Sequence, residues 1–354
     1  MEGELDHDPV SADPLADVLR AVRLDGACFR AVEAREPWSV VAVAARELTP
    51  RILPGAEHLI SYHIVTAGRC WAGLIGGPPV ALEPGDVIVF PHGDAHVMSS
   101  DPKLRMKSVP APPGRYPETV ILGDGGRVTT TLVCGFLGCD RRPFNPLLSV
   151  LPRRLHLRGV SSGGLQTFAR QVIEESRARR MGADSVLTRL AELMFVEALR
   201  RYVETLPPEQ RGWLAALRDP AIGRGLGLLH GAPAHPWTLD ELAEGVAMSR
   251  SAFSERFTAL VGQPPMHYLA QWRMQLAAGR LAMGNAKVAA IAEEVGYDSE
   301  PAFSRAFKRL MGVAPAAWGR ARARVGRNGF GARRRSSKVT LAAPQQAAAQ
   351  QGYG

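Results

Sequence analysis

Two cysteines that stand close together in the sequence are the first candidates for chemistry. Cys134 and Cys139 bound the segment Cys134-Gly-Phe-Leu-Gly-Cys139. Two thiols can be oxidised to a disulfide, although four intervening residues differ from the two of a thioredoxin-like motif. Burial as a small apolar residue is the ordinary role of cysteine. Two interpretations therefore stay open: a redox pair, or structural thiols like those expected of Cys28 and Cys70.

A second kind of chemistry, hydrogen bonding to base edges, is suggested by two polar helix faces. Each belongs to a segment in which two phenylalanines four residues apart mark the opposite, buried face. The polar residues are Arg250, Ser251, Ser254 and Glu255 in one segment, and Glu300, Ser304, Arg305 and Lys308 in the other. A helix-turn-helix motif needs this division, because one face is anchored while the other enters the major groove.

The two segments belong to an internal repeat of about 50 residues. Leu239, Leu242, Ala243 and Val246 recur as Val288, Ile291, Ala292 and Val295, and then Ser249, Phe253, Phe257, Gly262 and Pro265 recur as Ser299, Phe303, Phe307, Gly312 and Pro315. The offset grows by one residue between the two groups, so the second turn is longer than the first. Each serine is expected to cap its helix by accepting a hydrogen bond from a free N–H group. One copy also suits an ordinary helical bundle, but two matching copies favour a double reader over 239–260 and 288–311.

On these residues, the segment 219–318 resembles the DNA-binding domain of AraC/XylS-type transcriptional regulators. The motif residues are Trp237-Thr238-Leu239, Leu242-Ala243, Met248-Ser249-Arg250, Phe253, Phe257, Tyr268-Leu269, Trp272-Arg273-Met274, Ile291-Ala292, Val295-Gly296-Tyr297, Phe303, Phe307-Lys308 and Pro315. The resemblance implies that one helix over 265–282 joins two units in adjacent major-groove segments. Eighteen residues span about 27 Å, close to the ~34 Å of one DNA turn.

The same resemblance assigns base contacts and further contacts to DNA. The implied base-facing residues are Arg250, Ser251, Ser254, Glu255, Glu300, Pro301, Ser304 and Arg305, and Arg273 and Lys308 are counted with the DNA-binding residues. Residues 237–318 carry eight basic and eight acidic side chains. Affinity therefore cannot rest on bulk charge in this segment.

Nearer the N-terminus, residues 85–96 resemble the second motif of cupin barrels, G-x5-P-x-G-x2-H. His63-Ile64-Val65 with Gly68 resembles the strand and turn that close the first motif. Such a barrel joined to an AraC-type reader implies the sensing of a small molecule. Many cupins bind a metal, and the residues near the ligand positions are Glu57, His58, His63, His92 and His96. Two interpretations of the four histidines stay open: they hold a metal, or they are structural residues at the barrel mouth. No cofactor is required by the sequence. No catalytic base or nucleophile is evident beside these histidines.

The elements that must position these residues fall into three regions. Residues 15–150 contain short β-branched runs broken by Gly and Pro, which predict a barrel or sandwich. The expected strands are Ser39–Ala44, His63–Thr66, Trp71–Ile75, Asp86–Phe90 and Val128–Cys134. Residues 151–215 turn to helical spacing, with Asp184 as the expected N-cap, and form a connector that could pair two chains. Residues 326–354 are rich in Gly, Arg, Ala and Gln and are expected to be disordered.

Composition and charge narrow the class of protein. The chain has 354 residues, of which 46% are hydrophobic, so a mainly disordered protein is excluded. No apolar run approaches the ~18 residues that cross a bilayer. The acidic N-terminus lacks the pattern of a secretory signal. Four cysteines without a close pair of the CxxC type suit a reducing cytosol. The net charge is +9, but the segment from Gly319 to the end carries eight basic residues and no acidic ones. This tail is either solvated or attracts phosphates.

The sequence therefore predicts a multidomain α+β protein: an N-terminal cupin-like β-barrel, a helical connector and a C-terminal all-α double helix-turn-helix domain. Its expected function is that of a cytoplasmic, non-enzymatic, sequence-specific transcriptional regulator. The expected partners are double-stranded DNA and a small-molecule effector, with RNA polymerase and a second copy of the chain as further candidates. Two alternatives stay open: a cupin metalloenzyme fused to a helical domain, and an architectural binder of DNA without sequence preference.

Overall fold

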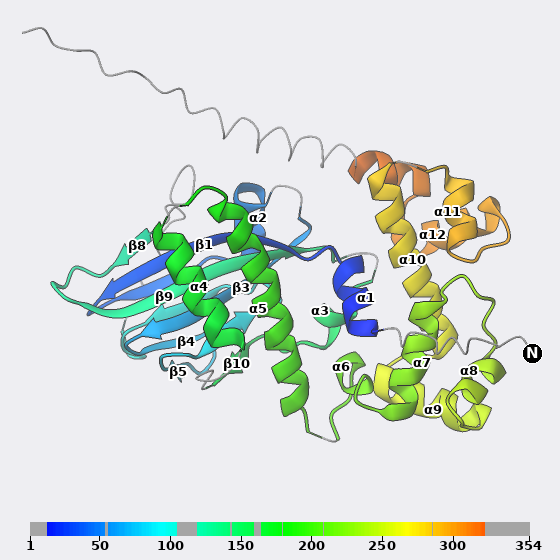
Figure 1. Ribbon diagram of the computed structural model, residues 1–354, viewed down its shortest axis with the longest axis horizontal. Coiled ribbons are helices and arrows are strands. Elements are labelled where there is room, and N and C mark those ends of the chain that lie inside the picture. Colours follow the sequence, from blue (N-terminus) through cyan, green and yellow to red (C-terminus); the bar gives the residue numbers. More distant parts are fainter. Residues whose placement is uncertain are drawn as a thin grey trace, which may run out of the picture.

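A β-sandwich and an all-helical unit lie side by side in the computed structural model (Figure 1). The structure describes residues 13–53, 56–104, 119–141, 144–158, 164–178, 180–207, 209–284 and 286–322. Within these ranges no helix is both long and apolar enough to cross a membrane. The predicted combination of a β-rich N-terminal region and a helical C-terminal region is confirmed.

The N-terminal sandwich consists of two sheets. The strands are β1 (Asp25–Arg35), β2 (Ser39–Ala42), β3 (His58–Ala67), β4 (Cys70–Leu74), β5 (Val80–Leu82), β6 (Val87–Phe90), β7 (His96–Ser99), β8 (Thr119–Leu122), β9 (Val128–Cys139) and β10 (Leu155–Leu157). One sheet has the order β10-β6-β3-β9-β1-β8 and the other has the order β2-β7-β4-β5. Each strand expected from the sequence falls within an observed one, or overlaps it within two residues at its end.

Alternation along the strands separates two cores. In β3, Ile60, Tyr62 and Ile64 face the helices outside the six-stranded sheet, and Val65 faces the space between the sheets. Successive side chains of a strand point to opposite faces, so the central strands β3, β6 and β9 contribute residues to both cores. The core between the sheets is made of Val32, Ala34, Trp38, Val65, Cys70, Ala72, Leu82, Ile88, Phe90, Met98 and Leu132.

The expected connector packs on the sandwich. Helices α4 (Gly164–Ala178) and α5 (Ala183–Thr205) form a hairpin across the outer face of the six-stranded sheet (Figure 1). The prediction of Asp184 as N-cap was wrong, because Gly182 occupies that position and Asp184 lies in the first turn. A carboxylate is also favourable there, since it faces the positive end of the helix dipole.

Short helices link the sandwich to the C-terminal unit: α1 (Pro14–Ala21), α3 (Pro146–Val150) and α6 (Trp213–Ala216). A further short helix, α2 (Ala45–Ile52), packs on β3 within the N-terminal domain. Helix α1 lies against α7 and α10, and α3 lies against α6. The indole N–H of Trp213 donates a 2.8 Å hydrogen bond to the Tyr268 hydroxyl, so α6 packs with the C-terminal helices although it precedes residue 219.

The C-terminal unit is all helical. Its elements are α7 (Pro220–Gly231), α8 (Leu239–Gly245), α9 (Arg250–Val261), α10 (Pro265–Met283), α11 (Val288–Glu294) and α12 (Glu300–Met311). The pairs α8–α9 and α11–α12 lie at the two ends of α10 (Figure 1). The joining helix expected over 265–282 is therefore α10, whose 19 residues span about 28 Å.

The two helix pairs differ in how they are anchored. The core of α8–α9 is continuous with the core that lies between the six-stranded sheet and its helices. The pair α11–α12 has a separate core, made of Met274, Ala277, Ala278, Leu281, Ile291, Ala292, Val295, Phe303, Phe307 and Trp318. The first pair is thus fixed to the N-terminal sandwich, whereas the second is held mainly by α10 and the segment after α12.

Candidate nucleic-acid interface and barrel site

The expected serine caps are present in both helix pairs. The Ser249 hydroxyl accepts a hydrogen bond from the Ala252 amide at 3.3 Å, and the Ser299 hydroxyl accepts one from the Ala302 amide at 3.4 Å. Each second helix ends at a glycine in the left-handed conformation, Gly262 or Gly312. Capping at both ends fixes the length and start of α9 and of α12.

The turns are equivalent up to a single inserted residue. The Met248 amide donates to the Ala243 carbonyl at 2.9 Å, and the Tyr297 amide donates to the Ala292 carbonyl at the same distance. The added residue of the second copy, Asp298, therefore follows this bond and precedes the cap. The predicted longer second turn is confirmed.

The polar faces of both second helices lie at the protein surface. The phenylalanine pairs beneath them are fully buried. Arg250, Ser251, Glu255, Glu300, Pro301, Arg305 and Lys308 are exposed, and Ser254 and Ser304 are half-buried. Leu239, Ser249, Arg250, Ser251 and Ser254 line a shallow depression at the start of α9. One ion pair crosses this face, between the Arg250 guanidinium and Asp240 at 3.2 Å.

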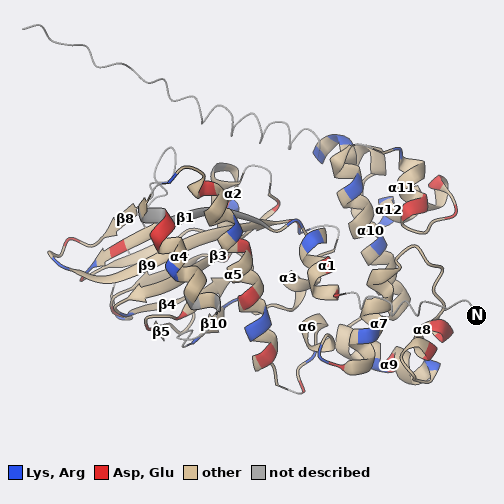
Figure 2. Ribbon diagram, in the orientation of Figure 1, with Lys and Arg blue, Asp and Glu red and all other residues tan. Residues whose placement is uncertain are grey.

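Charge is mixed across this surface. Basic and acidic residues are interspersed over the C-terminal helices (Figure 2). On α12, however, the exposed basic residues Arg305, Lys308 and Arg309 lie within two turns of one another. Discrimination between DNA sequences by this unit would rest on individual side chains, because no large uniform field is available.

The guanidinium of Arg273 is engaged within the protein. It donates to the carbonyls of Pro233 at 2.7 Å, His235 at 2.8 Å and Gly296 at 3.1 Å. These bonds tie α10 to the segment before α8 and to the turn between α11 and α12. Because its donors are directed to backbone oxygens, Arg273 positions the two helix pairs relative to each other, and its expected role as a DNA contact is not supported.

One cation of the basic tail is also engaged within the protein. Arg322 pairs with Glu57 and with Asp140 of the sandwich, and its guanidinium lies 4.8 Å from the centre of the Trp318 ring. Asp140 is shared, since Arg23 donates two hydrogen bonds to it at 2.6 and 3.0 Å. Arg322 therefore joins the end of the C-terminal unit to the sandwich, while the tail over 326–354 lies outside the described residues.

Only two of the four barrel histidines come together. The Nε2–H of His58 donates to the Pro91 carbonyl at 2.7 Å, and that of His92 donates to the Leu151 carbonyl at 2.9 Å. In contrast, Nε2 of His63 and Nε2 of His96 are 2.7 Å apart between the two sheets. The Phe90 ring stacks on His96 with ring centroids 3.8 Å apart, which holds that imidazole in place.

These histidines do not fit a metal. Two nitrogens on one tetrahedral metal lie about 3.3 Å apart, since each bond is about 2.0–2.1 Å long. His58 and His92 point to backbone carbonyls, and the described part of the chain contains no group of three or more His, Cys, Asp or Glu side chains arranged to hold a metal ion. The interpretation of the four histidines as one ligand set is therefore not supported.

A cysteine completes the contacts of His63. His63 and Cys134 are paired across β3 and β9, and Nδ1 of His63 lies 2.8 Å from the Cys134 sulfur. The far nitrogen of His96, Nδ1, lies 2.9 Å from the Asp94 carbonyl. Burial lowers the pKa of His96 to about 4, so this imidazole is neutral at pH 7. Each of these residues is a candidate in the sequence by itself, but their juxtaposition was missed, because only the strand register brings them together.

The proposed thiol pair does not form. Cys134 and Cys139 are five residues apart on β9, which separates their Cα atoms by about 17 Å and places the side chains on opposite faces. A disulfide requires Cα atoms within about 7 Å. Burial raises the pKa of Cys139, and likewise of Cys70, to about 12. Of the two interpretations left open by the sequence, the Cys134–Cys139 redox pair is therefore not supported by the strand geometry.

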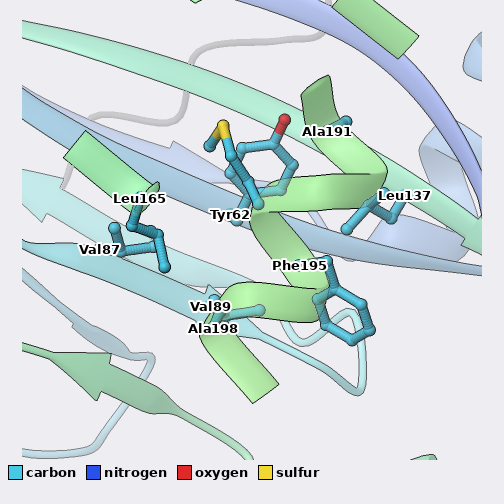
Figure 3. Close-up of a pocket in the computed structure, with 9 residues that line it drawn as sticks. Tyr62, Val87, Val89, Leu137, Leu165, Ala191, Phe195 and Ala198 are labelled. Atoms are coloured by element: carbon cyan, nitrogen blue, oxygen red, sulfur yellow. The ribbon is translucent and has the colours of Figure 1, made fainter. Parts of the chain in front are cut away.

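A narrow apolar pocket lies outside the sandwich. It is lined by Tyr62, Val87, Val89 and Leu137 of the sheet and by Leu165, Ala191, Met194, Phe195 and Ala198 of the helices (Figure 3). In this state it has room for no more than a water-sized molecule.

Two buried polar residues at the junction of the sandwich and the helical unit were also missed. Gln275 of α10 donates to the Ala21 carbonyl at 2.8 Å and accepts from the Phe144 amide at 3.1 Å. Nε2 of His230 is 2.7 Å from the Tyr268 hydroxyl, and its Nδ1 is 3.6 Å from Asp17. A polar residue inside an apolar helical stretch, such as Gln275 between Met274 and Ala277, was the available signal.

A sandwich fused to two capped helix pairs on one joining helix defines a DNA-binding regulator with a separate N-terminal domain. Comparisons with known proteins agree. The cupin family model matches residues 13–204, and the helix-turn-helix domain model matches residues 242–321. The chain belongs to the AraC family of transcriptional regulators, and its relatives are regulators, not enzymes.

Individual relatives cover most of the chain. An AraC-like transcription regulator of Streptomyces lividans is 33% identical over 86% of this chain and 96% of its own length. The regulator AlkR of Acinetobacter baylyi is 30% identical over 73% of this chain and 87% of its own length. Among solved structures, the DNA-binding domain of AdpA in complex with a target DNA is 31% identical, covering 30% of this chain and 95% of that chain, with a TM-score of 0.28.

Proposed function

We propose that the protein is a sequence-specific regulator in which α9 and α12 read two adjacent major-groove segments. The observation that carries this proposal is the matched pair of surface faces, each on a capped helix anchored by two buried phenylalanines, at the two ends of α10. Helix α10 has a length close to one turn of DNA, so both faces can reach the same side of a duplex. The proposed base-contacting residues are the eight predicted from the sequence, and Arg273 is not proposed as a DNA contact.

Arg305 tests this proposal most sharply. It is exposed on α12, two residues beyond the buried Phe303, which directs it about 200° away from the core. An arginine that bonds O6 and N7 of guanine contributes about 1–3 kcal/mol of discrimination. Arg305→Ala is therefore expected to relax the preference at one position of the site while the preference at the other positions remains.

The matched control is Arg200→Ala, which removes the same charge from an exposed position on α5. Binding of both variants to a panel of single-base variants of the site separates the outcomes. A uniform loss over all sequences would mean that Arg305 holds a phosphate. Binding equal to that of Arg200→Ala on every duplex would contradict the placement of α12 in the groove.

We further propose that the N-terminal domain senses an uncharged apolar small molecule. The pocket of Figure 3 supports this class of effector, because its lining is apolar apart from the Tyr62 hydroxyl and comes from both the sheet and α5. Binding would require α5 to move outward, and α5 packs on the core that continues into α8–α9. A ligand of the folded state raises the unfolding temperature with its concentration. Medium-chain alkyl compounds should raise the unfolding temperature of the parent. They should not raise that of Ala198→Phe, which fills the pocket. An unchanged unfolding temperature of the parent would contradict this effector class.

A second copy of the chain is the proposed partner at α5. Val186 and Leu193 are seven residues apart on one side of this helix and are 45% and 49% exposed. Apolar side chains on an exposed helix face suit a helix-to-helix dimer. Leu193→Glu should shift the sedimentation of a dimer to that of a monomer. Arg69→Glu, an exposed position in the turn between β3 and β4, should not. A parent that sediments as a monomer would contradict the proposal.

A further inference from the structure

The side chains of Cys134, His63 and His96 form a continuous chain across the inside of the sandwich. Cys134 lies on β9, His63 on β3 and His96 on β7 of the opposite sheet. The two contacts are 2.8 Å from the sulfur to Nδ1 of His63 and 2.7 Å from Nε2 of His63 to Nε2 of His96. Both imidazoles are buried, with 7% and 1% of their surface exposed.

The hydrogen-bond partners determine where the protons lie. Nδ1 of His96 faces the Asp94 carbonyl, which can only accept, so that nitrogen carries the proton of the neutral ring. Nε2 of His96 is then an acceptor, and Nε2–H of His63 must donate to it. Nδ1 of His63 is left as an acceptor and faces the Cys134 thiol. His63 is thereby held in the tautomer that can take the thiol proton.

This arrangement consists of a nucleophile, a base and a group that orients the base. From it we propose that Cys134 is a modification site at which a small hydroperoxide oxidises the thiol to a sulfenic acid. The thiol proton passes to Nδ1 of His63, and the thiolate sulfur attacks the terminal oxygen of the hydroperoxide. The O–O bond breaks, the sulfur gains the hydroxyl group, and the alkoxide or hydroxide leaving group takes the proton from His63. The sulfur is oxidised by two electrons and the peroxide is reduced to an alcohol or water.

The surroundings make Cys134 more reactive toward a small oxidant than Cys70 and Cys139, the other thiols in the described part of the chain. Cys134 is partly exposed, whereas Cys70 and Cys139 are buried, and their raised pKa values keep them protonated. Neighbours on the same face, including Leu132 and Phe90, are packed core residues. Sulfenic acid formation adds a single oxygen atom to Cys134, so it needs little extra room among these packed side chains.

The modification is placed to affect the DNA-binding unit. Strand β9 continues directly into Asp140, which binds Arg23 and Arg322. A displacement of β9 against β3 would therefore reach the segment that follows α12. This regulatory consequence rests on the proposed function in DNA binding, whereas the chemical step at Cys134 does not.

The chemical step is tested on the full chain with hydrogen peroxide and dimedone, which traps sulfenic acid, followed by peptide mass spectrometry. Within one sample, Cys134 should be trapped at least about 10-fold faster than Cys70 and Cys139. His63→Asn, which removes the base, should slow trapping at Cys134 about 10-fold or more, and His58→Asn should leave the rate unchanged. Equal trapping of the three thiols in the parent, a comparison that needs no variant, would overturn the proposal. The proposal would also be overturned if His63→Asn, with an unfolding temperature equal to that of the parent, were trapped at Cys134 at the parental rate.

The regulatory step is tested by the affinity for a duplex selected from a random library, before and after peroxide treatment. The affinity should change at least about fivefold in the parent and not in Cys134→Ser. An unchanged affinity with Cys134 fully trapped would overturn regulation through this site. Absence of DNA binding by the untreated parent would instead contradict the proposed function and leave the trapping result standing.

Discussion

The side-chain amide of Gln275 bonds Ala21, a residue 254 positions earlier in the chain, at 2.8 Å. The same side chain accepts from the Phe144 amide, so the centre of α10 is tied to two segments of the N-terminal domain. Together with the Arg322 ion pairs, these bonds fix how the DNA-binding unit sits on the sandwich. The relation between the two domains is therefore specific and polar, and it is not left to apolar contact alone.

Replacement of Gln275 by leucine should destabilise the full chain. The Phe144 amide and the Ala21 carbonyl would lose their partner in a buried site, which costs about 1–3 kcal/mol in free energy of unfolding. The matched control is Gln271→Leu on the same helix, whose side chain is half-buried and pairs only with Gln263 in the described part of the chain. Urea unfolding midpoints that fall equally for the two variants would show that the Gln275 bridge contributes no specific stability.

Gly296→Ala should weaken the second helix pair selectively. Gly296 has a φ of +78°, and a Cβ atom added there would lie 2.4 Å from the Ala234 carbonyl oxygen. Gly284 has a similar φ of +72° with open space around it, so Gly284→Ala carries the conformational cost alone. We expect Gly296→Ala to lose roughly 1–3 kcal/mol more than Gly284→Ala, as in overpacked cores. Equal unfolding free energies would contradict the close contact between this turn and the segment before α8.

Acidification below pH 6.5 should destabilise the protein through its buried histidines. Burial lowers the pKa of His96 to about 4, and it also lowers the pKa values of His58 and His230 from their ordinary value of 6.5. Between these pKa values the unfolded chain binds protons that the native state does not bind. The free energy of unfolding is therefore highest above the histidine pKa of the unfolded chain, and it decreases as the pH falls toward the pKa of the native state. His96 alone should contribute about 3 kcal/mol across this interval.

The measurement is the free energy of unfolding between about pH 7 and pH 5, where carboxylates with lowered pKa values stay ionised. His96→Gln should reduce the slope of stability against pH, because glutamine can bond His63 and Asp94 without titrating. His267→Gln is the control, since His267 is exposed on α10. A His96→Gln slope equal to that of the parent would contradict a neutral, buried His96.

The features that the sequence predicted are those encoded within a few residues. The caps at Ser249 and Ser299, the turn glycines and the phenylalanine pairs follow from local spacing, and the repeat doubled that information. Contacts set by strand register could not be predicted in this way, because a register shift of one residue would move Cys134 away from His63 without changing any local pattern. The internal hydrogen bonds of Arg273 could not be predicted for a similar reason. Its motif is shared with DNA-binding domains, but its direction depends on carbonyls 40 residues earlier and 23 residues later.

The central claim is that two helices of one chain read two adjacent major-groove segments. It is tested most directly by selecting duplexes from a random library with the full chain and sequencing those that bind. The account predicts a site with two conserved blocks whose centres are about 10–10.5 base pairs apart, one weakened by substitutions on α9 and the other by Arg305→Ala. A single block, or enrichment without any sequence preference, would contradict it.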